Sequence, residues 1–292
     1  FRRLKAMSDG LPPPPSLLRL QRNDDFNRML DENIHNVALP KGQLMLCQVR
    51  TGESGVALDH EGGIHTLAWD PDGKTLAIAS SLVAEIRLVD VWQGTITGEF
   101  AGHTGEQNRS NPAQTLGRGV SSLAWSPDGR TLASGGRDMM VRLWNTGGGG
   151  GRVLMGHSGT VVSLAWSPDG VLLASGAEDH SVRLWNAATG KALRTRQGIL
   201  GGVDMVLQGH DSWVQSLCWL EGGAVLVSAG EDARLLLWDI PGGALCGELM
   251  GHMAGVRKLA VSPDGRLLAS GGYDQTICLW DWRRGARLVV LP

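Results

Sequence analysis

The chain has 292 residues, and its 27 lysines and arginines against 29 aspartates and glutamates give a formal net charge of −2. A chain so close to neutral lacks the clustered positive charge that nucleic-acid binding needs, so direct binding of nucleic acid is disfavoured. No apolar stretch approaches the ~20 residues of a membrane-spanning helix. The four cysteines show no paired metal spacing and sit in apolar runs, which favours free thiols in a reducing compartment. We therefore expect an intracellular protein, cytoplasmic or alternatively nuclear, that does not enter membranes.

The chain begins with a segment that contains four successive prolines, Pro12 to Pro15. Such a run favours a stiff, extended polyproline conformation over regular strands or helices. We assign residues 1–15 to an extended N-terminal segment and residues 16–292 to one folded domain. Because the sequence starts at Phe1 and not at methionine, we expect a processed or incomplete piece of a longer protein.

Three short apolar segments follow, at 16–21, 33–39 and 43–49. They have the length of strands, and we interpret them as the first, second and third strands of one degenerate unit. In the third segment, Cys47 and Gln48 stand where the later units carry a Trp-Asp pair. This unit is therefore expected to depart from the repeat that follows.

From His60 onward the sequence repeats one unit, which is clearest after the pair Gly156-His157. Its parts are an apolar run at 161–166, a Ser-Pro-Asp-Gly turn at 167–170, a second run at 172–176 and a third at 182–185. Runs this short, bounded by such turns, are typical of strands joined by hairpins. One such sheet cannot bury both of its faces alone, so successive units are expected to stack.

A Gly-His pair opens four of these units, and a Trp-Asp or Trp-Asn pair closes each of them. The separation between the two pairs is the same in the units that run from His157, His210 and His252. The unit that runs from His103 is longer. A repeat of about 40 residues with this signature resembles the WD40 family of β-propellers. The resemblance implies an all-β propeller with six recognisable blades, or seven as the alternative, of which the first is degenerate.

The family resemblance also implies a structural role for a His, a Ser or Thr, an Asp and a Trp in each blade, joined by hydrogen bonds. The expected sets are His157, Ser163, Asp179 and Trp185, then His210, Ser216, Asp232 and Trp238, and then His103, Ser122, Asp138 and Trp144. In the last unit Lys258 stands at the expected serine position, so we expect an incomplete set there. In the unit after His60, Val89 replaces the tryptophan, and that blade should rely on packing.

Two insertions interrupt the repeat, at 104–118 and at 194–205. The first is polar, and we expect it to form an exposed arm on the narrow face of the propeller. The segment 286–291 is expected to complete the last blade as its outer strand. Four tryptophans recur at the end of the first strand and are expected to pack between blades, namely Trp69, Trp125, Trp166 and Trp219.

The sequence carries no metalloprotease, serine-hydrolase or cysteine-nucleophile signature, so we expect no enzymatic activity, no cofactor and no metal. Partners of this family usually dock on the narrow face, and the resemblance places eight candidate residues there. Those before the structural aspartate are Arg137, Glu178, Glu231 and Tyr273, and those beside the start of the first strand are His65, Trp213, Gln215 and Arg257. Exposed Trp, Tyr and Arg are enriched in binding hot spots.

The main hypothesis is a non-enzymatic protein-interaction scaffold that is a subunit of a larger assembly. A second hypothesis is a substrate receptor of a cullin-RING ubiquitin ligase, because Trp280-Asp281-Trp282-Arg283 resembles the Trp-Asp-x-Arg motif of such receptors. Against it, Cys278 stands where a basic residue is common, and Trp282 is bulkier than usual. A third hypothesis is a protein-facing subunit of a ribonucleoprotein complex. Fold alone does not separate these three.

Overall fold

The structure is a computed structural model that describes residues 17–19, 42–47, 54–60, 63–80, 83–103, 119–148, 150–193 and 205–291. Within these ranges the chain forms strands β1 to β24 and one short 3-10 turn, η2 (Glu221–Gly223), and no α-helix. The predicted all-β fold is therefore confirmed. No helix in this described part is long and apolar enough to cross a membrane. The predicted N-terminal segment 1–15 and the polar stretch 104–118 lie outside the described residues.

The strands group into six antiparallel sheets, which we number blade 1 to blade 6 in chain order. Blade 1 contains β1 (Leu17–Arg19), β2 (Gly42–Cys47) and β3 (Ser54–His60). Blade 2 contains β4 (Thr66–Trp69), β5 (Thr75–Ala79), β6 (Glu85–Asp90) and β7 (Thr95–Ala101), and blade 3 contains β8 (Val120–Trp125), β9 (Thr131–Gly136), β10 (Val141–Asn145) and β11 (Arg152–Leu154). Blade 4 contains β12 (Val161–Trp166), β13 (Leu172–Ala177), β14 (Ser181–Asn186), β15 (Lys191–Ala192) and β16 (Val206–Gln208). Blade 5 contains β17 (Val214–Leu220), β18 (Val225–Gly230), β19 (Arg234–Asp239) and β20 (Ala244–Met250), and blade 6 contains β21 (Val256–Val261), β22 (Leu267–Gly272), β23 (Ile277–Asp281) and β24 (Ala286–Leu291).

Blade 1 is the degenerate unit that the sequence predicts, with three described strands. The segments predicted at 16–21 and 43–49 both contain strands. However, β1 pairs directly with β2, with Leu18 opposite Leu46, so β1 lies where the strand at 33–39 was expected. The segment 33–39 itself falls outside the described residues.

The outer strands of blades 4 and 6 lie where the sequence predicts an insertion and a final strand, respectively. In blade 4, β15 and β16 both pair with β14, so the insertion near 194–205 divides the outer strand and leaves the three inner strands continuous. Most of that insertion lies outside the described residues. In blade 6, β24 pairs with β23 from Ala286 to Leu291, which confirms the predicted outer strand.

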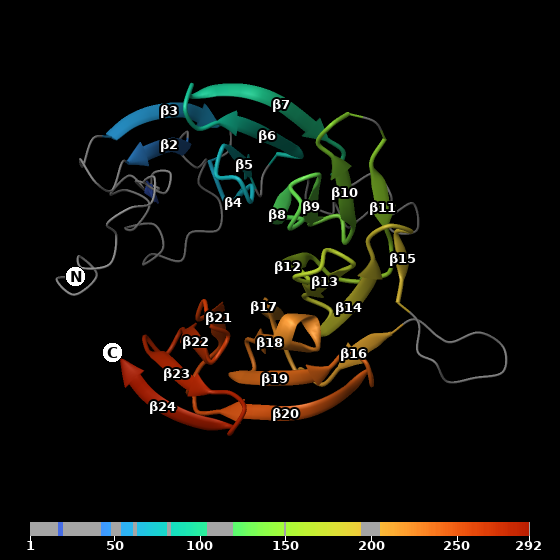
Figure 1. Ribbon diagram of the computed structural model, residues 1–292, viewed down its shortest axis with the longest axis vertical. Coiled ribbons are helices and arrows are strands. Elements are labelled where there is room, and N and C mark those ends of the chain that lie inside the picture. The colour runs from blue at the N-terminus through green and yellow to red at the C-terminus, as the bar shows by residue number, and fades with distance from the viewer. Residues whose placement is uncertain are drawn as a thin grey trace, which may run out of the picture.

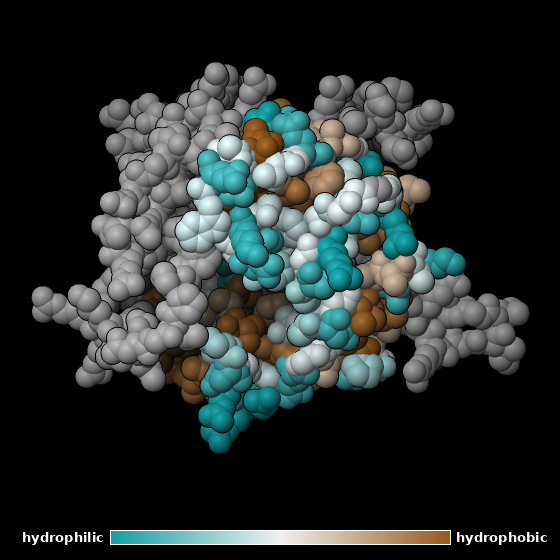
Figure 2. Space-filling view, turned by 45° about the horizontal axis from the view of Figure 1, so that its top comes forward, coloured by the Kyte–Doolittle hydropathy of each residue, from teal (hydrophilic) through white to brown (hydrophobic). Residues whose placement is uncertain are grey.

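The blades follow one another around a common centre (Figure 1). In blades 2 to 6 the first strand of each sheet lies nearest to this centre, and the last strand lies at the periphery. The space-filling view shows hydrophobic side chains in a hollow near the middle, while hydrophilic side chains cover much of the described surface around it (Figure 2). This arrangement of radial sheets is the propeller that the repeat predicts.

The hydrophobic core lies between successive blades. In β19, Leu236 and Trp238 pack with residues of blade 4, whereas Leu235 and Leu237 pack with residues of blade 6. Successive side chains of a strand point to opposite faces of the sheet, so each blade offers one face to each neighbour. Burial of a side chain of this size contributes about 1.5–3 kcal/mol, and stacking is therefore what stabilises each sheet.

Blade 6 has a free face, which we define as the side that points away from blade 5 and carries Ile277 and Leu291. Leu235 of blade 5 is fully buried, but Ile277 holds the same place in blade 6 and is 47% exposed. Leu249 of β20 and Leu291 of β24 show the same contrast, with 2% and 45% exposed. No described blade packs against this side.

Three tryptophans at the ends of first strands tie neighbouring blades together. Trp125 donates its indole hydrogen to the carbonyl of Ala68, and Trp166 donates to Ala124, each at 3.0 Å. Trp219 donates to Ala165 in the same way. Their predicted position between blades is confirmed. Because the bonds recur at equal heights, the first strands stand in register, and equivalent turns of blades 2 to 5 share one face of the propeller.

Candidate partner-binding face

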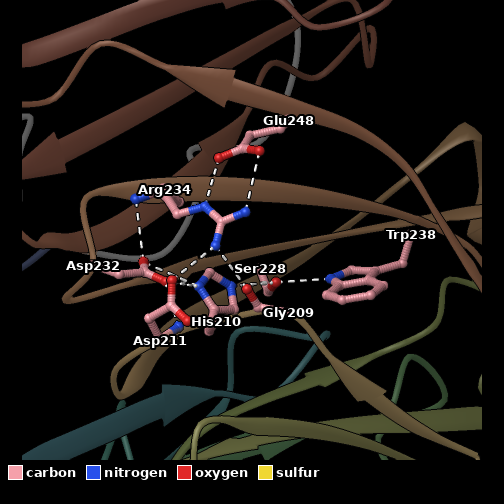
Figure 3. A network of polar contacts seen from close by, with 8 residues as sticks. All are labelled: Gly209, His210, Asp211, Ser228, Asp232, Arg234, Trp238 and Glu248. Carbon is pink, nitrogen blue, oxygen red and sulfur yellow. Dashed lines mark hydrogen bonds and ion pairs between the residues drawn. The ribbon is translucent and has the colours of Figure 1, made fainter.

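A chain of hydrogen bonds links four side chains in each of blades 3 to 6. In blade 5, Trp238 Nε1 donates to Ser228 Oγ at 2.8 Å, and His210 Nε2 lies 2.8 Å from the same oxygen (Figure 3). His210 Nδ1 lies 2.8 Å from Asp232 Oδ2. An indole N–H can only donate, so the serine oxygen accepts it, the serine hydroxyl donates to Nε2, and Nδ1–H donates to the aspartate.

The same contacts recur in three other blades. The sets are His103, Ser134, Asp138 and Trp144; His157, Ser175, Asp179 and Trp185; and His252, Ser270, Asp274 and Trp280. The predicted histidines, aspartates and tryptophans are therefore confirmed as partners of one another.

The serine predicted for each set is wrong, because the bonded serine lies on the second strand and not on the first. It stands 10 residues before the tryptophan in all four blades, a spacing visible in the sequence. The first-strand serines contact the next blade instead. Ser163 Oγ donates to the carbonyl of Val214 at 3.2 Å, and Ser216 Oγ accepts a hydrogen bond from the backbone N–H of Leu259 at 3.1 Å. For Ser122, sequence position and β-pairing place it beside Gly135, apart from the set.

The set of blade 6 is consequently complete, and the expectation that Lys258 interrupts it is wrong. Ser270 of β22 accepts the indole hydrogen of Trp280 and lies 2.7 Å from His252 Nε2. Lys258 corresponds to Ser216, a position that faces the next blade. In blade 2, Ile78 and Val89 take the places of serine and tryptophan and are fully buried, which confirms that this blade relies on packing.

The aspartates of these sets hold the loop before the first strand against the turn between the second and third strands. Burial raises the pKa of Asp179, but hydrogen bonding and electrostatic attraction to His157, with hydrogen bonds from Ser181 and the backbone of Ser158, outweigh the effect of burial and leave the pKa below its usual range. Asp232 and Asp274 have lowered pKa values from similar opposing causes. An ionised carboxylate that accepts several hydrogen bonds makes this end of each blade rigid.

A β-bulge near the start of the first strand redirects one side chain in each of blades 3 to 6. The pairing shifts between Val120 and Ser122, and at the equivalent place in the other three blades. The extra residues are Ser121, Val162, Gln215 and Arg257. Bulges commonly re-aim a side chain beside a functional site. Here Ser121 Oγ donates to the carbonyl of Val161, so the redirected side chain reaches the next blade.

Five of the eight predicted binding residues meet at the junction of blades 5 and 6. Gln215 donates to Glu231 Oε1 at 2.8 Å, and Arg257 Nη1 donates to Gln215 Oε1 at 3.1 Å. The Arg257 guanidinium also lies 5.2 Å from the centre of the Tyr273 ring. The Trp213 carbonyl accepts the backbone N–H of Glu231 at 2.9 Å. Trp213 and Tyr273 remain 41% and 57% exposed, so apolar surface flanks this polar network.

The other three residues lie at the same end of blades 2 to 4. Arg137 and Glu178 occupy the turn position that Glu231 and Tyr273 hold, and their backbone N–H groups bond to Gly119 and Thr160. His65 directly precedes β4 and is exposed. No side-chain contact joins Arg137 or Glu178 to the network among the described residues. We call the surface that carries all eight residues the bulge face.

Two features of the described residues bear on catalytic chemistry. No group of three or more His, Cys, Asp or Glu side chains in the described ranges could hold a metal ion. Burial raises the pKa of the Cys218 thiol to about 12, which removes its nucleophilic thiolate at neutral pH. The bulge face instead offers exposed aromatic rings beside a positioned guanidinium.

Comparison with known families agrees with this architecture. The family described as "WD domain, G-beta repeat" (WD40) matches residues 53–82, 110–145, 151–186, 202–239 and 243–281. These segments make up more than half of the chain, so the chain belongs to the WD40 family. Proteins built on such propellers act in general as protein-interaction scaffolds.

Several characterised proteins are similar to parts of the chain. Nuclear distribution protein PAC1-2 of Uncinocarpus reesii is 33% identical over 212 residues, which cover 65% of this chain and 42% of that protein. Protein HIR1 of Kluyveromyces lactis is 26% identical over 183 residues, 60% of this chain and 17% of that protein. WD repeat-containing protein 1 of Rattus norvegicus is 33% identical over 94 residues, 32% of this chain and 13% of that protein. The chain thus matches less than half the length of each of these relatives.

Proposed function

We propose that this protein is a subunit of a larger assembly and binds partner proteins through its bulge face. The observation that carries the proposal is the network of Gln215, Glu231, Arg257 and Tyr273 across the junction of blades 5 and 6. The residues at these positions differ between blades. The repeat therefore does not require these side chains, although they contact one another here.

The mixture of groups on this surface supports a role in protein recognition. Trp213 and Tyr273 supply large, rigid contact area, and binding hot spots are enriched in Trp, Tyr and Arg. Hydrogen bonding holds Arg257 in place before a partner arrives, which reduces the entropy lost on binding. We also propose that the protein acts inside the cell, in the cytoplasm or the nucleus, and that residues 16–292 form one domain.

A second candidate function is the substrate receptor of a cullin-RING ligase. Arg283, the last residue of the Trp-Asp-x-Arg sequence, is about half exposed, pairs with Glu221 of blade 5 at 3.1 Å and lies 4.7 Å from the Trp282 ring centre. A positioned, exposed arginine at this place favours the candidate. If Arg283→Ala abolishes binding to the adaptor subunit of such a ligase, the receptor function is supported. If binding to the adaptor is unchanged, the result counts against the receptor function. No feature of the described residues favours a ribonucleoprotein subunit.

The bulge face is tested by affinity capture and mass spectrometry with the full chain and three variants. Trp213→Ala and Tyr273→Ala should each lose the same set of partners. Trp92→Ala is the matched control, because Trp92 is exposed in the turn after β6, at the opposite end of its blade. Partners that remain bound to both bulge-face variants and leave only Trp92→Ala would contradict the proposal.

A further inference from the structure

Two positive side chains at the edge of the bulge face have unused binding capacity. Arg257 engages Gln215 through Nη1 only, and its Nε and Nη2 hydrogens have no partner among the described residues. Lys258, the next residue, has no hydrogen bond or ion pair in that same part of the chain. Both are exposed. A guanidinium has five donors, and an ammonium has three, so most of their capacity is open.

The repeat explains why these two positions point outward. At the bulge, Ser121 and Gln215 each reach the following blade, through the Val161 carbonyl and through Arg257. At the next position, Ser216 accepts a hydrogen bond from the backbone of Leu259 in the following blade. Blade 6 has no described blade after it. The two positions that contact the following blade elsewhere are therefore occupied in blade 6 by two cations, Arg257 and Lys258, which lie beside the free face.

No acidic side chain in the described residues neutralises this pair. The nearest carboxylate of the network, Glu231, accepts the hydrogen bond from Gln215. Partial withdrawal from water and the charge of Arg257 hold the pKa of Lys258 below its usual value, as expected for a cation that lacks an anion. An incoming anion would relieve this repulsion.

We propose that Arg257 and Lys258 form an anion-binding site that takes carboxylate side chains from an acidic segment of a partner protein. This inference rests on the proposed function, since the site lies on the bulge face. The open Nε and Nη2 donors of Arg257 form a planar fork that matches a carboxylate. The exposed ring of Tyr273, whose centre lies 5.2 Å from the Arg257 guanidinium, can contact apolar side chains of the same segment.

Carboxylates fit this site better than phosphates do. Only two cations are present, and Glu231 is one side chain away from Arg257 through Gln215. These two cations and Glu231 sum to about one positive charge, which a singly charged carboxylate neutralises and a doubly charged phosphate would exceed. The net charge of −2 likewise gives no long-range attraction for a nucleic acid.

The test measures binding of a dye-labelled peptide of alternating glutamate and leucine to the full chain by fluorescence anisotropy. Arg257→Gln and Lys258→Gln should each weaken binding about tenfold, the usual effect of losing a charge-assisted contact. Arg257→Lys keeps the charge but loses the fork and should fall between. Arg266→Gln is the matched control in the same blade, because Arg266 is well exposed and lies 3.8 Å from Asp264 alone. Thermal melts confirm that each variant is folded.

Peptides with other chemistry identify the source of the anion. The same peptide with glutamine for glutamate should not bind, and added salt should weaken the acidic one. Tighter binding of a phosphoserine peptide or a single-stranded oligonucleotide would overturn the assignment to carboxylates. Equal affinity of wild type, Arg257→Gln and Lys258→Gln would overturn the site itself.

Failure of the site and failure of the proposed function give different results. If Trp213→Ala and Tyr273→Ala lose natural partners while Arg257→Gln binds the acidic peptide normally, only the anion site is refuted. If those two variants keep every partner while Arg257→Gln loses the peptide, the site stands and the bulge face is not the main docking surface.

Discussion

Arg234 and Glu248 form a two-point ion pair that joins the third and outer strands of blade 5. Arg234 Nε lies 2.5 Å from Glu248 Oε1, and Nη2 lies 3.2 Å from Oε2 (Figure 3). The same guanidinium donates through Nη1 to the carbonyl of Gly209, directly before His210. In blades 4 and 6 the equivalent residue is Ser181 or Thr276, whose side chain contacts the aspartate and histidine of its own set, and Thr276 Oγ1 also lies 4.0 Å from Cys278 Sγ. In blade 6, Arg287 of the outer strand β24 donates to the equivalent carbonyl of Gly251, so blade 5 differs in that its link comes from the third strand.

Replacement of Arg234 should therefore destabilise the chain. Arg234→Ala leaves the Gly209 carbonyl and Glu248 without their donor, and we expect a loss of about 1–2 kcal/mol in the free energy of unfolding measured with urea. Arg284→Ala is the control, because Arg284 is largely exposed and 3.6 Å from Asp281. Equal losses in the two variants would show that the bonds to Gly209 and Glu248 contribute nothing.

The two serines of blade 4 should differ in their effect on stability. Ser175→Ala leaves the buried Trp185 indole N–H and His157 Nε2 unpaired, and we expect a loss of about 2–4 kcal/mol. Ser163→Ala removes one bond of 3.2 Å to the Val214 carbonyl and should cost about 1 kcal/mol. A urea titration of both variants decides the point. A larger loss for Ser163→Ala would mean that the first strand supplies the serine after all.

Asp179→Ala is expected to lower the free energy of unfolding by about 1–3 kcal/mol, although Asp179 is not among the proposed partner-protein contacts. It removes the acceptor for His157 Nδ1, for the Ser158 backbone and for Ser181. The melting temperature of the variant gives the answer. An unchanged value would show that water replaces the carboxylate in this turn.

Stability should decline in acid. Asp179, Asp232 and Asp274 have folded pKa values below the usual 3.8. A depressed folded pKa contributes stability that is complete above the unfolded pKa and is lost as pH falls toward the folded pKa. The urea midpoint should therefore hold from pH 7 to about 5 and fall below about 4. Asp179→Asn should lower the midpoint at pH 7 and make the acid decline shallower, and a parallel curve would refute this cause.

Two glycines at neighbouring positions of the second strand, one in blade 3 and one in blade 6, test the space beside the histidine and the space on the free face. At Gly136 an added Cβ would collide with the His103 ring and the Asp138 carboxylate, so Gly136→Ala should cost about 1–3 kcal/mol. At Gly271 no atom lies within 4 Å of an added Cβ, and Gly271→Ala should be neutral or slightly stabilising. Thermal unfolding of both variants provides the comparison. Destabilisation by Gly271→Ala would indicate that something covers the free face of blade 6.

The repeat predicted the fold well because spacing and turns are local properties. The positions of His157, Asp179 and Trp185 follow from the repeat, and the structure joins them. The choice between Ser163 and Ser175 could not be made from polarity alone, since both are serines in strands. It depends on which face of a strand points to the histidine. The missed signal was that the Ser175 position is a serine in all four blades, since blade 6 has Ser270 there but Lys258 at the Ser163 position.

The candidate site was predictable by position but not by contact. Equivalent places in the repeat suggested Gln215, Glu231, Arg257 and Tyr273 as separate exposed residues. That they form one network depends on the bulge, which redirects Gln215 and Arg257, and on the stacking of blade 6 against blade 5. Neither feature has a sequence signature of its own.

The hydrogen bonds from the tryptophans to the preceding blades predict the order in which the blades of the propeller separate. Each indole donates backward, from Trp125, Trp166 and Trp219 to the carbonyl of the preceding blade. When the later blade detaches, the earlier one keeps a carbonyl that water can reach, and the freed indole leaves with its own sheet. Blade 6 has Val261 in place of the tryptophan and no such bond to break. Opening should thus begin at the C-terminal blade, and amide hydrogens of β23 and β24 should exchange before those of β13 and β14.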